Sequence, residues 1–217
     1  HGFTLGKDSP AAFRISRHLA GEGIGMLRYD ALGLGDSDGA WGDGSFTVKV
    51  DDAVKAGEFL TARGTPPDII VGHSWGGAAA IVAAQQLPSV RAVVTIGAPS
   101  DPSGVERHYN AIIDRVMEAG SGTWLVGGKA LTLERAFVED VRRADLIARV
   151  RTLGRPLLIM HSPTDSTVEI DNASEIFRAA LHPRSFVSLE GADHFLTVDG
   201  QAERAARIIG AWADQYL

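Results

Sequence analysis

Two serines of this 217-residue chain lie in the pattern Gly-x-Ser-x-Gly, which can expose a nucleophilic hydroxyl on a sharp turn between a strand and a helix. Ser74 directly follows a strand-like apolar run and precedes a run of small residues that is typical of a helix. Ser37 lies between two aspartates in a glycine-rich stretch, where negative charge would oppose formation of an anion, so we interpret it as a turn residue. The context therefore favours Ser74 as the nucleophile of an acyl transfer over the simpler role of a helix N-cap.

A serine nucleophile needs a base that takes its proton and an acid that orients the base. In an open α/β sheet these partners follow later strands, in the order serine, acid, histidine. His194 comes after the strand-like run 186–189, and Asp165 comes after the run 157–160. We expect His194 to be the base and Asp165 the acid, with Asp101, which follows an earlier strand, as the rival acid.

The remaining polar groups receive other roles. His73, beside the nucleophile, is expected to pack in the core, and His161 to be either an outer hydrogen-bond donor or a core residue. His18, His108 and His182 lie on surface-like patterns. Because the histidines are scattered without the spacing of metal ligands, we expect no metal site.

Two backbone N–H groups are expected to form an oxyanion hole. One belongs to Trp75, which follows the nucleophile, and the other to Phe3, in the turn His1-Gly2-Phe3 after an earlier strand. Gly2 would let the backbone approach the substrate closely.

The elements that must position these residues alternate between strands and helices. Strands are predicted at 24–29, 69–71, 92–96, 157–160 and 186–189. Helices are predicted at about 10–20, 48–63, 75–87, 172–181 and 201–216. Most of the strands are continuous apolar runs, as in a parallel sheet that is buried on both faces. The alternation predicts an α/β fold with helices on both faces of a mostly parallel sheet, in one domain over 1–217.

The stretch from about 100 to 155 interrupts this alternation. It predicts a helix at 105–119, a hairpin at 123–133 with a turn at Gly127-Gly128, and a helix at 134–150. An insertion of this size is either a lid or pocket wall, or extra packing. If it covers the site, apolar side chains would face the acyl group of the substrate, with these candidates: Tyr109, Ile112, Trp124 and Phe137.

Composition excludes several classes of protein. The net charge of −6 offers no basic footprint for nucleic acid, and no apolar run approaches the roughly 18 residues of a membrane span. The chain has no cysteine, which excludes disulfides, thiolate catalysis and cysteine-bound metals. We expect a cytoplasmic protein that acts on a small-molecule ester; the composition does not indicate an oligomeric state.

Five motifs together resemble the α/β-hydrolase superfamily over almost the whole chain: HGF, GLGDSDG, GHSWGG, SPTD and GADH. Further stretches, among them IGAP and SFVSL, are similar to bacterial serine hydrolases that are often fused to an osmotically inducible peroxidase-type domain. The resemblance implies carboxylesterase activity without a cofactor, and the apolar candidates favour short to medium acyl chains. Trp75 departs from the smaller residue that is usual there, which predicts a tighter pocket beside the oxyanion hole.

Other functions remain open on the same residues. A thioesterase, a peptidase or a perhydrolase would use the same triad, and a non-enzymatic interaction domain could retain a relic of it.

The resemblance also implies a central strand before the His-Gly turn, between 24–29 and 69–71, for which the chain has no residues. An open gap would leave backbone groups unpaired, each at a cost of about 1–3 kcal/mol. The flanking strands could pair directly, another chain could supply the strand, or an upstream part of a longer protein could do so. We favour the upstream part.

Overall fold

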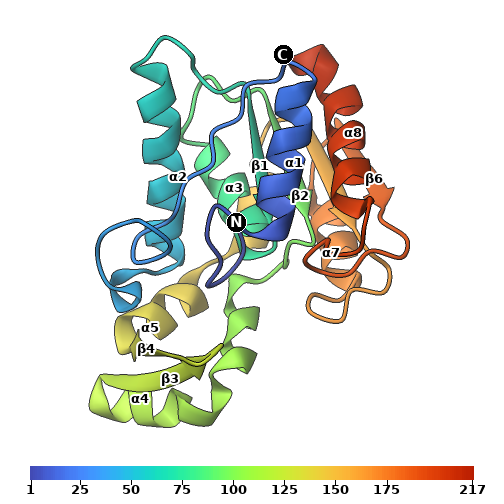
Figure 1. Cartoon of the computed structure of the whole chain (residues 1–217). Coiled ribbons are helices and arrows are strands. Elements are labelled where there is room, and N and C mark those ends of the chain that lie inside the picture. The colour runs from blue at the N-terminus through green and yellow to red at the C-terminus, as the bar shows by residue number, and fades with distance from the viewer.

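The computed structural model describes all residues from 1 to 217 and centres on a four-stranded parallel sheet (Figure 1). The strand order is β1-β2-β5-β6. The strands are β1 (Ile69–His73), β2 (Ala92–Ile96), β5 (Leu157–His161) and β6 (Arg184–Ser188). Every residue of β2 and β5 is buried, which explains why their sequences are continuously apolar. Four of the five predicted strands and the predicted α/β architecture are therefore confirmed.

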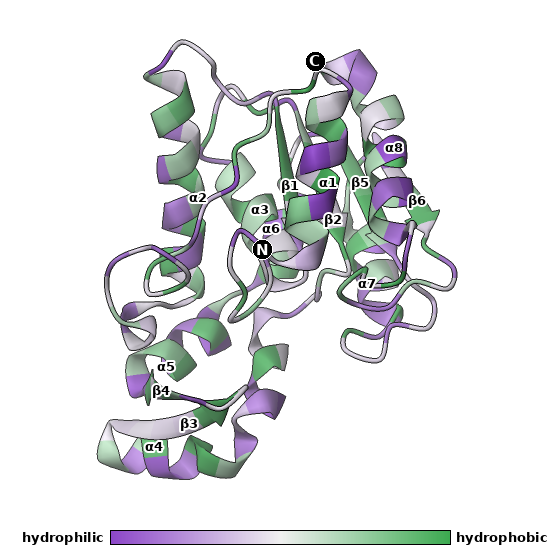
Figure 2. Cartoon of the chain, viewed as in Figure 1, coloured by the Kyte–Doolittle hydropathy of each residue, from purple (hydrophilic) through white to green (hydrophobic).

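Helices cover both faces of this sheet. On one face lie α1 (Pro10–Gly21) and α8 (Gln201–Ala213), and on the other lie α2 (Phe46–Thr61), α3 (Trp75–Ala84) and α7 (Asp171–Ala179). A hydrophobic core lies on each side of the sheet, and alternate strand residues contribute to each core because successive side chains of a strand point to opposite faces. Val94 and Leu158 pack with α1 and α8, whereas Val93 and Leu157 pack with α2 and α3. Figure 2 shows this hydrophobic centre with hydrophilic stretches on the outer helices.

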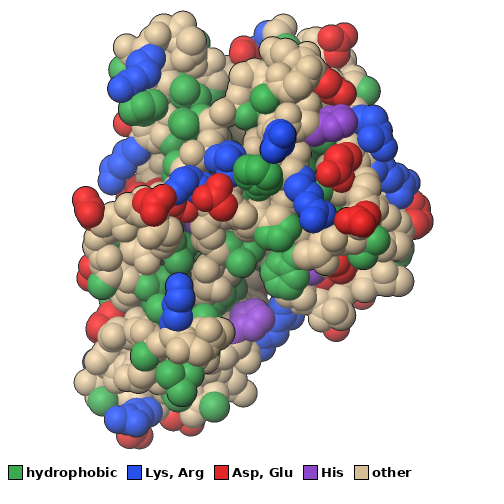
Figure 3. Space-filling model, in the orientation of Figure 1, with side chains coloured by type: hydrophobic (Ala, Val, Ile, Leu, Met, Phe, Trp, Pro, Cys, Tyr) green, Lys and Arg blue, Asp and Glu red, His purple; other side chains and the backbone are tan.

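Local sequence accounts for several of these boundaries. Pro10 opens α1, where its missing N–H costs nothing. Small residues fill α3 because nine of its ten residues are buried, wedged between the sheet and α2. On the face shown in Figure 3, acidic and basic side chains are interspersed.

The insertion between β2 and β5 forms a separate layer below the sheet in Figure 1. Its hairpin consists of β3 (Ser121–Val126) and β4 (Lys129–Glu134), paired antiparallel. The turn residues Gly127 and Gly128 have φ of 53° and 79°, as a two-residue hairpin requires. The predicted hairpin is therefore confirmed.

The prediction of one long helix on each side of the hairpin is wrong. The first is divided into two 3-10 helices, Pro102–His108 and Asn110–Ile112, and α4 (Ile113–Ala119); the chain leaves helical geometry at Tyr109, whose side chain turns into the core. The second is divided into α5 (Arg135–Arg143) and α6 (Leu146–Arg151). Asp145 breaks it, because its carboxylate accepts the Ala148 N–H at 2.9 Å and caps α6.

The strand predicted at 24–29 is also wrong. These residues join no sheet, and β1 pairs only with β2. Ile24 and Met26 pack against the α1 and α8 core. A largely apolar groove of about 860 Å³ lies between the segment and β1. Direct pairing of the two segments is therefore excluded.

Candidate active site

Ser74 lies on a strained turn between β1 and α3. Its φ is 54° and its ψ is −129°, a conformation that costs a serine roughly 1–3 kcal/mol and that clusters at functional sites. The turn is tight: a Cβ on Gly72 would lie 2.3 Å from the Gly76 carbonyl oxygen. The Ser74 N–H donates to the carbonyl of Ile96 at 2.7 Å, which ties the turn to the end of β2. The strand–turn–helix context expected from the sequence is therefore present.

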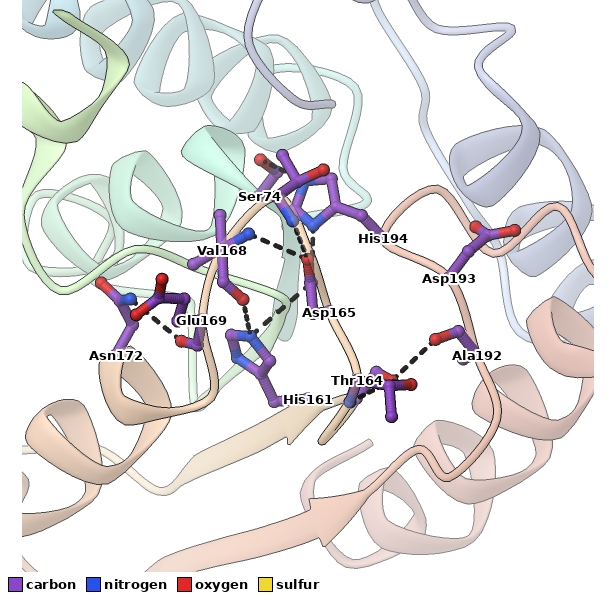
Figure 4. Close-up of polar contacts among 12 residues, drawn as sticks. Ser74, His161, Thr164, Asp165, Val168, Glu169, Asn172, Ala192, Asp193 and His194 are labelled. Carbon is purple, nitrogen blue, oxygen red and sulfur yellow. Dashed lines mark hydrogen bonds and ion pairs between the residues drawn. The ribbon is translucent and has the colours of Figure 1, made fainter. Parts of the chain in front are cut away.

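Two loops at the same end of the sheet bring His194 and Asp165 to this serine (Figure 4). The Ser74 Oγ lies 2.9 Å from Nε2 of His194, and Nδ1 of His194 lies 2.7 Å from Oδ2 of Asp165. All three side chains are buried. Assigned from these partners, the serine hydroxyl donates to Nε2 and the Nδ1–H donates to the carboxylate. The arrangement can pass a proton from serine to imidazole while the carboxylate holds the ring.

The Asp165 carboxylate is held ionised by its other contacts. Its Oδ1 accepts the N–H groups of Thr167 and Val168, both at 2.8 Å. Burial alone raises the pKa of this carboxyl, but the hydrogen bonds from His194 and the two N–H groups outweigh it, so the pKa lies below its usual value. The rival, Asp101, instead accepts the N–H and hydroxyl of Ser103 at 2.9 and 2.8 Å and begins the first 3-10 helix of the insertion.

Gly97 lies against the His194–Asp165 pair, and the sequence did not identify it as part of the site. It follows β2 with φ of 57°, and a Cβ there would lie 3.3 Å from both Asp165 Oδ2 and His194 Nδ1. The absence of a side chain therefore leaves room for the histidine–aspartate pair. The sequence held one signal for it: a glycine that directly follows β2, the strand that pairs with β1.

Two buried histidines hold the loops that carry His194 and Asp165. The Nε2–H of His73 donates to the backbone carbonyl of His194 at 2.7 Å, and that of His161 donates to the carbonyl of Val168 at 2.8 Å. Burial, and then repulsion by His194, lower the pKa of His73 to about 3, so its ring is neutral. His73 is packed in the core, as expected, and its ring also makes this hydrogen bond. His161 is a hydrogen-bond donor, which was one of the two roles expected for it.

The turn His1-Gly2-Phe3 lies against the turn that carries Ser74. A Cβ on Gly2 would lie 3.2 Å from Ser74 Cβ and 3.6 Å from its Oγ. A Cβ on Gly76 would lie 2.4 Å from the carbonyl oxygen of His1, so the two backbones also touch there. This contact brings together the two turns that carry Phe3 and Trp75.

An aromatic cluster from the insertion packs on Phe3 and Trp75. The Phe3 ring centre lies 5.2 Å from that of Trp75, and between 5.8 and 6.5 Å from those of Tyr109, Trp124 and Phe137. The remaining pocket candidate, Ile112, is partly buried against the same core. The insertion therefore packs on Phe3 and Trp75, and the Trp75 indole N–H anchors it by donating to the carbonyl of Pro102 at 3.1 Å.

Two further aromatic residues, which were not predicted from the sequence to lie here, contact this cluster. Trp41 lies 5.7 Å from the rings of both Phe3 and Trp124. His108 stacks on Phe3 with the ring centres 6.0 Å apart and remains exposed to solvent, as expected from the sequence. A cavity of about 30 Å³, the size of one water molecule, lies among Phe3, Trp41, Trp75 and Phe137.

Comparisons with known proteins agree with this geometry. A family model described as the alpha/beta hydrolase family matches residues 1–208. The esterase domain of a Rhodothermus marinus protein shares 40% identity and a TM-score of 0.76, with 100% of this chain and 85% of that chain covered. No curated protein matches the sequence.

More distant solved structures share the fold. Est1E from Butyrivibrio proteoclasticus, solved with ferulic acid bound, has a TM-score of 0.79 at 18% identity and covers 100% of this chain and 86% of its own. The alpha/beta hydrolase GrgF from Penicillium sp. sh18 has a TM-score of 0.83 at 16% identity. The match covers 99% of this chain and 87% of the GrgF chain. None of the helices is long and apolar enough to cross a membrane.

From the match over residues 1–208 and the 40% identity to a solved esterase domain, the chain belongs to the alpha/beta hydrolase family.

Proposed function

We propose that this hydrolase is a carboxylesterase in which Ser74 is the nucleophile, His194 the general base and Asp165 the acid that orients the base. The observation that carries the proposal is the unbroken chain of hydrogen bonds, 2.9 Å from Ser74 to His194 and 2.7 Å from His194 to Asp165. Such a chain activates a hydroxyl that is otherwise a weak nucleophile. The chemistry needs no cofactor.

In the proposed reaction Ser74 Oγ attacks the ester carbonyl while His194 Nε2 takes its proton. The backbone N–H groups of Phe3 and Trp75 stabilise the oxyanion of the tetrahedral intermediate, for which the close contact of their two turns is suited. His194 then protonates the leaving alcohol, and an acyl-enzyme remains on Ser74. Water, activated by the same histidine, releases the acid and restores the serine.

The aromatic cluster supports an apolar acyl group of short to medium length as the substrate. Tyr109, Trp124 and Phe137 pack on Phe3, the proposed oxyanion donor, and Ile112 lies in the same core. An apolar wall disfavours charged acyl groups, because they would lose their hydration without a partner. The 40% identity to the esterase domain from Rhodothermus marinus also favours an ester as the substrate.

A fluorophosphonate probe tests the nucleophile. The wild-type chain should be labelled and Ser74→Ala should not, while Ser37→Ala, in the second Gly-x-Ser-x-Gly pattern, should be labelled like the wild type. A panel of p-nitrophenyl esters from acetate to dodecanoate, with a thioester, an anilide, a succinate half-ester and an aromatic acyl ester, then defines the substrate class. Labelling of Ser74→Ala, or turnover only of the charged or non-ester substrates, would contradict the proposal.

The acid is tested by a matched pair of variants. Asp165→Asn should lower kcat by about 10⁴-fold, because an amide holds the imidazole in the wrong tautomer. Asp101→Asn should stay within about threefold of the wild type, since Asp101 binds Ser103 at the start of the insertion. The reverse order of effects in steady-state kinetics would transfer the acid role to Asp101.

A further inference from the structure

The base of the proposed triad lies on an irregular segment, so regular structure does not fix its position. β6 ends at Ser188, and α8 begins at Gln201, so His194 lies in the middle of a twelve-residue connection. Leu196, two residues later, has φ of 53°, a conformation that a leucine rarely adopts. A segment of this kind needs specific contacts to hold a ring to within a fraction of an ångström.

One such contact joins the base to the strand of the nucleophile. The Nε2–H of His73, the last residue of β1, donates to the backbone carbonyl of His194 at 2.7 Å across 121 positions of sequence. Both side chains are buried, and their ring centres lie 5.1 Å apart. Because His73 immediately precedes Ser74, this bond links the backbone of the base, through the His73 side chain, to the residue before the nucleophile.

A second contact holds the same segment from the opposite loop. The hydroxyl of Ser162, in the loop that carries Asp165, donates to the carbonyl of Ala192 at 2.7 Å. The backbone of the base is therefore held from the nucleophile's strand at one residue and from the acid's loop two residues earlier. His73 binds the carbonyl of the proposed base itself, whereas Ser162 binds the carbonyl of Ala192.

The protonation state of His73 suits this role. A carbonyl only accepts, so the bonded Nε2 carries the proton, and the buried Nδ1 has no partner, as in a neutral ring. Burial and repulsion by His194 keep the pKa of His73 at about 3. His73 therefore donates without adding a positive charge beside an imidazole that becomes charged during turnover.

We propose that His73 is a positioning residue: its hydrogen bond to the carbonyl of His194 fixes the imidazole of the base between the hydroxyl of Ser74 and the carboxylate of Asp165. The kinetic consequences rest on the proposed esterase function, whereas the geometric claim does not. A small displacement of a catalytic group costs up to about 100-fold in rate, so loss of the bond should act on kcat more than on KM.

Two substitutions separate the hydrogen bond from the volume of the ring. His73→Phe keeps the ring and removes the donor, and should lower kcat by roughly 10–100-fold with KM within about threefold. His73→Gln retains an N–H at nearly the position of Nε2 and should recover most of kcat. Thr95→Val, which removes an unpartnered buried hydroxyl from the neighbouring strand, controls for a general change in the core and should match the wild type.

Equal losses in His73→Phe and His73→Gln, or an unchanged kcat in His73→Phe, would overturn the proposal, because the donor would then not matter. Thermal unfolding of each variant shows whether it is folded. Should His73→Phe not fold, His73→Asn replaces it, since its shorter amide stops short of the carbonyl while the site remains polar.

NMR spectroscopy of histidine-labelled protein tests the geometry without turnover. The proton between His194 Nδ1 and Asp165 should give a low-field signal, identified by its loss in Asp165→Asn. We expect the signal in the wild type and in His73→Gln, and its loss or broadening in His73→Phe. A persistent, sharp signal in His73→Phe would refute the positioning role. Absence of esterase activity in the wild type would instead refute the proposed function and leave the NMR result to decide on His73.

Discussion

At the scale of single residues, a glycine lies directly against the proposed nucleophile, Ser74. Gly2 lies where a Cβ would be 3.2 Å from Ser74 Cβ, a separation tighter than normal contact, and its neighbour Phe3 is the proposed oxyanion donor. One such donor is worth about 2.7–4 kcal/mol in the transition state. A change at this position should therefore affect chemistry more than binding.

Gly2→Ala is expected to lower kcat at least about tenfold, because the methyl group would push the turn and its N–H away from the developing oxyanion. Steady-state kinetics with the best p-nitrophenyl ester measure the effect. Gly25→Ala is the control: its added Cβ would meet nothing within 4 Å, so activity should stay within about twofold. Similar losses in both variants would contradict the proposed position of the oxyanion hole.

At the scale of elements, the loop after residue 29 is organised by one buried carboxylate. Asp30 accepts the N–H of Lys7 at 2.6 Å, the ammonium of Lys7 at 2.5 Å and the N–H of Asp36 at 3.0 Å. Burial by itself raises the pKa of Asp30, but these bonds outweigh it and lower the pKa to about 2. The carboxylate therefore connects the turn after Phe3 with the glycine-rich loop.

Because the pKa of Asp30 is lower in the folded than in the unfolded chain, its stabilisation is complete above pH of about 3.9 and is lost as the pH falls toward 2. Asp30→Asn should make the free energy of unfolding less dependent on pH across this window. Urea titrations at several pH values measure the slope. Asp68→Asn, at an exposed carboxylate 3.9 Å from Arg91, should leave the slope unchanged; equal effects would contradict the role of Asp30.

The hairpin of the insertion offers a test of its packing through two adjacent residues. Trp124 is 8% exposed within the aromatic cluster, whereas Leu125 is 72% exposed on the other side of β3. Trp124→Ala should lower the free energy of unfolding by about 3–5 kcal/mol and shift the acyl-chain preference in the ester panel. Leu125→Ala should change stability by no more than about 0.5 kcal/mol and leave the preference intact.

An unchanged acyl-chain preference in Trp124→Ala, despite the loss of stability, would show that the insertion packs on the molecule without forming the wall of the pocket. This outcome would separate the two roles that the insertion can have.

At the scale of the whole molecule, the most conspicuous feature is the groove of about 860 Å³ between β1 and residues 24–29. Its walls are largely apolar and include the outer edge of β1, where backbone groups have no neighbouring strand. Water or an added segment must satisfy those groups, because unpaired buried ones are costly.

The folded chain is expected to bind an apolar fluorescent dye in this groove, with enhanced dye fluorescence in the absence of denaturant. Ala56→Trp, which adds a large side chain on the groove face of α2, should reduce the signal. Lys55→Trp adds the same side chain at the exposed neighbouring position and should not. No dye enhancement in the folded wild type would show that the groove is closed in solution.

The sequence by itself determined the features that depend on local chemistry. A buried apolar run, a tight turn with glycines and a helix of small residues identify the setting of Ser74, because each acts on its own neighbours in the chain. The same local rules predicted four of the strands and the hairpin at Gly127-Gly128. They also placed Asp165 and His194 after later strands, the two loops that the structure brings to Ser74.

Only the tertiary structure decided which distant groups meet. Residues 24–29 have the pattern of a strand yet join no sheet, since a strand also needs a partner at hydrogen-bonding distance. The bond from His73 to the carbonyl of His194, the space left by Gly97 and the packing of Trp41 in the aromatic cluster depend on the order β1-β2-β5-β6 and on the placement of the insertion. These contacts join residues far apart in the sequence, and only the folded chain brings their partners together.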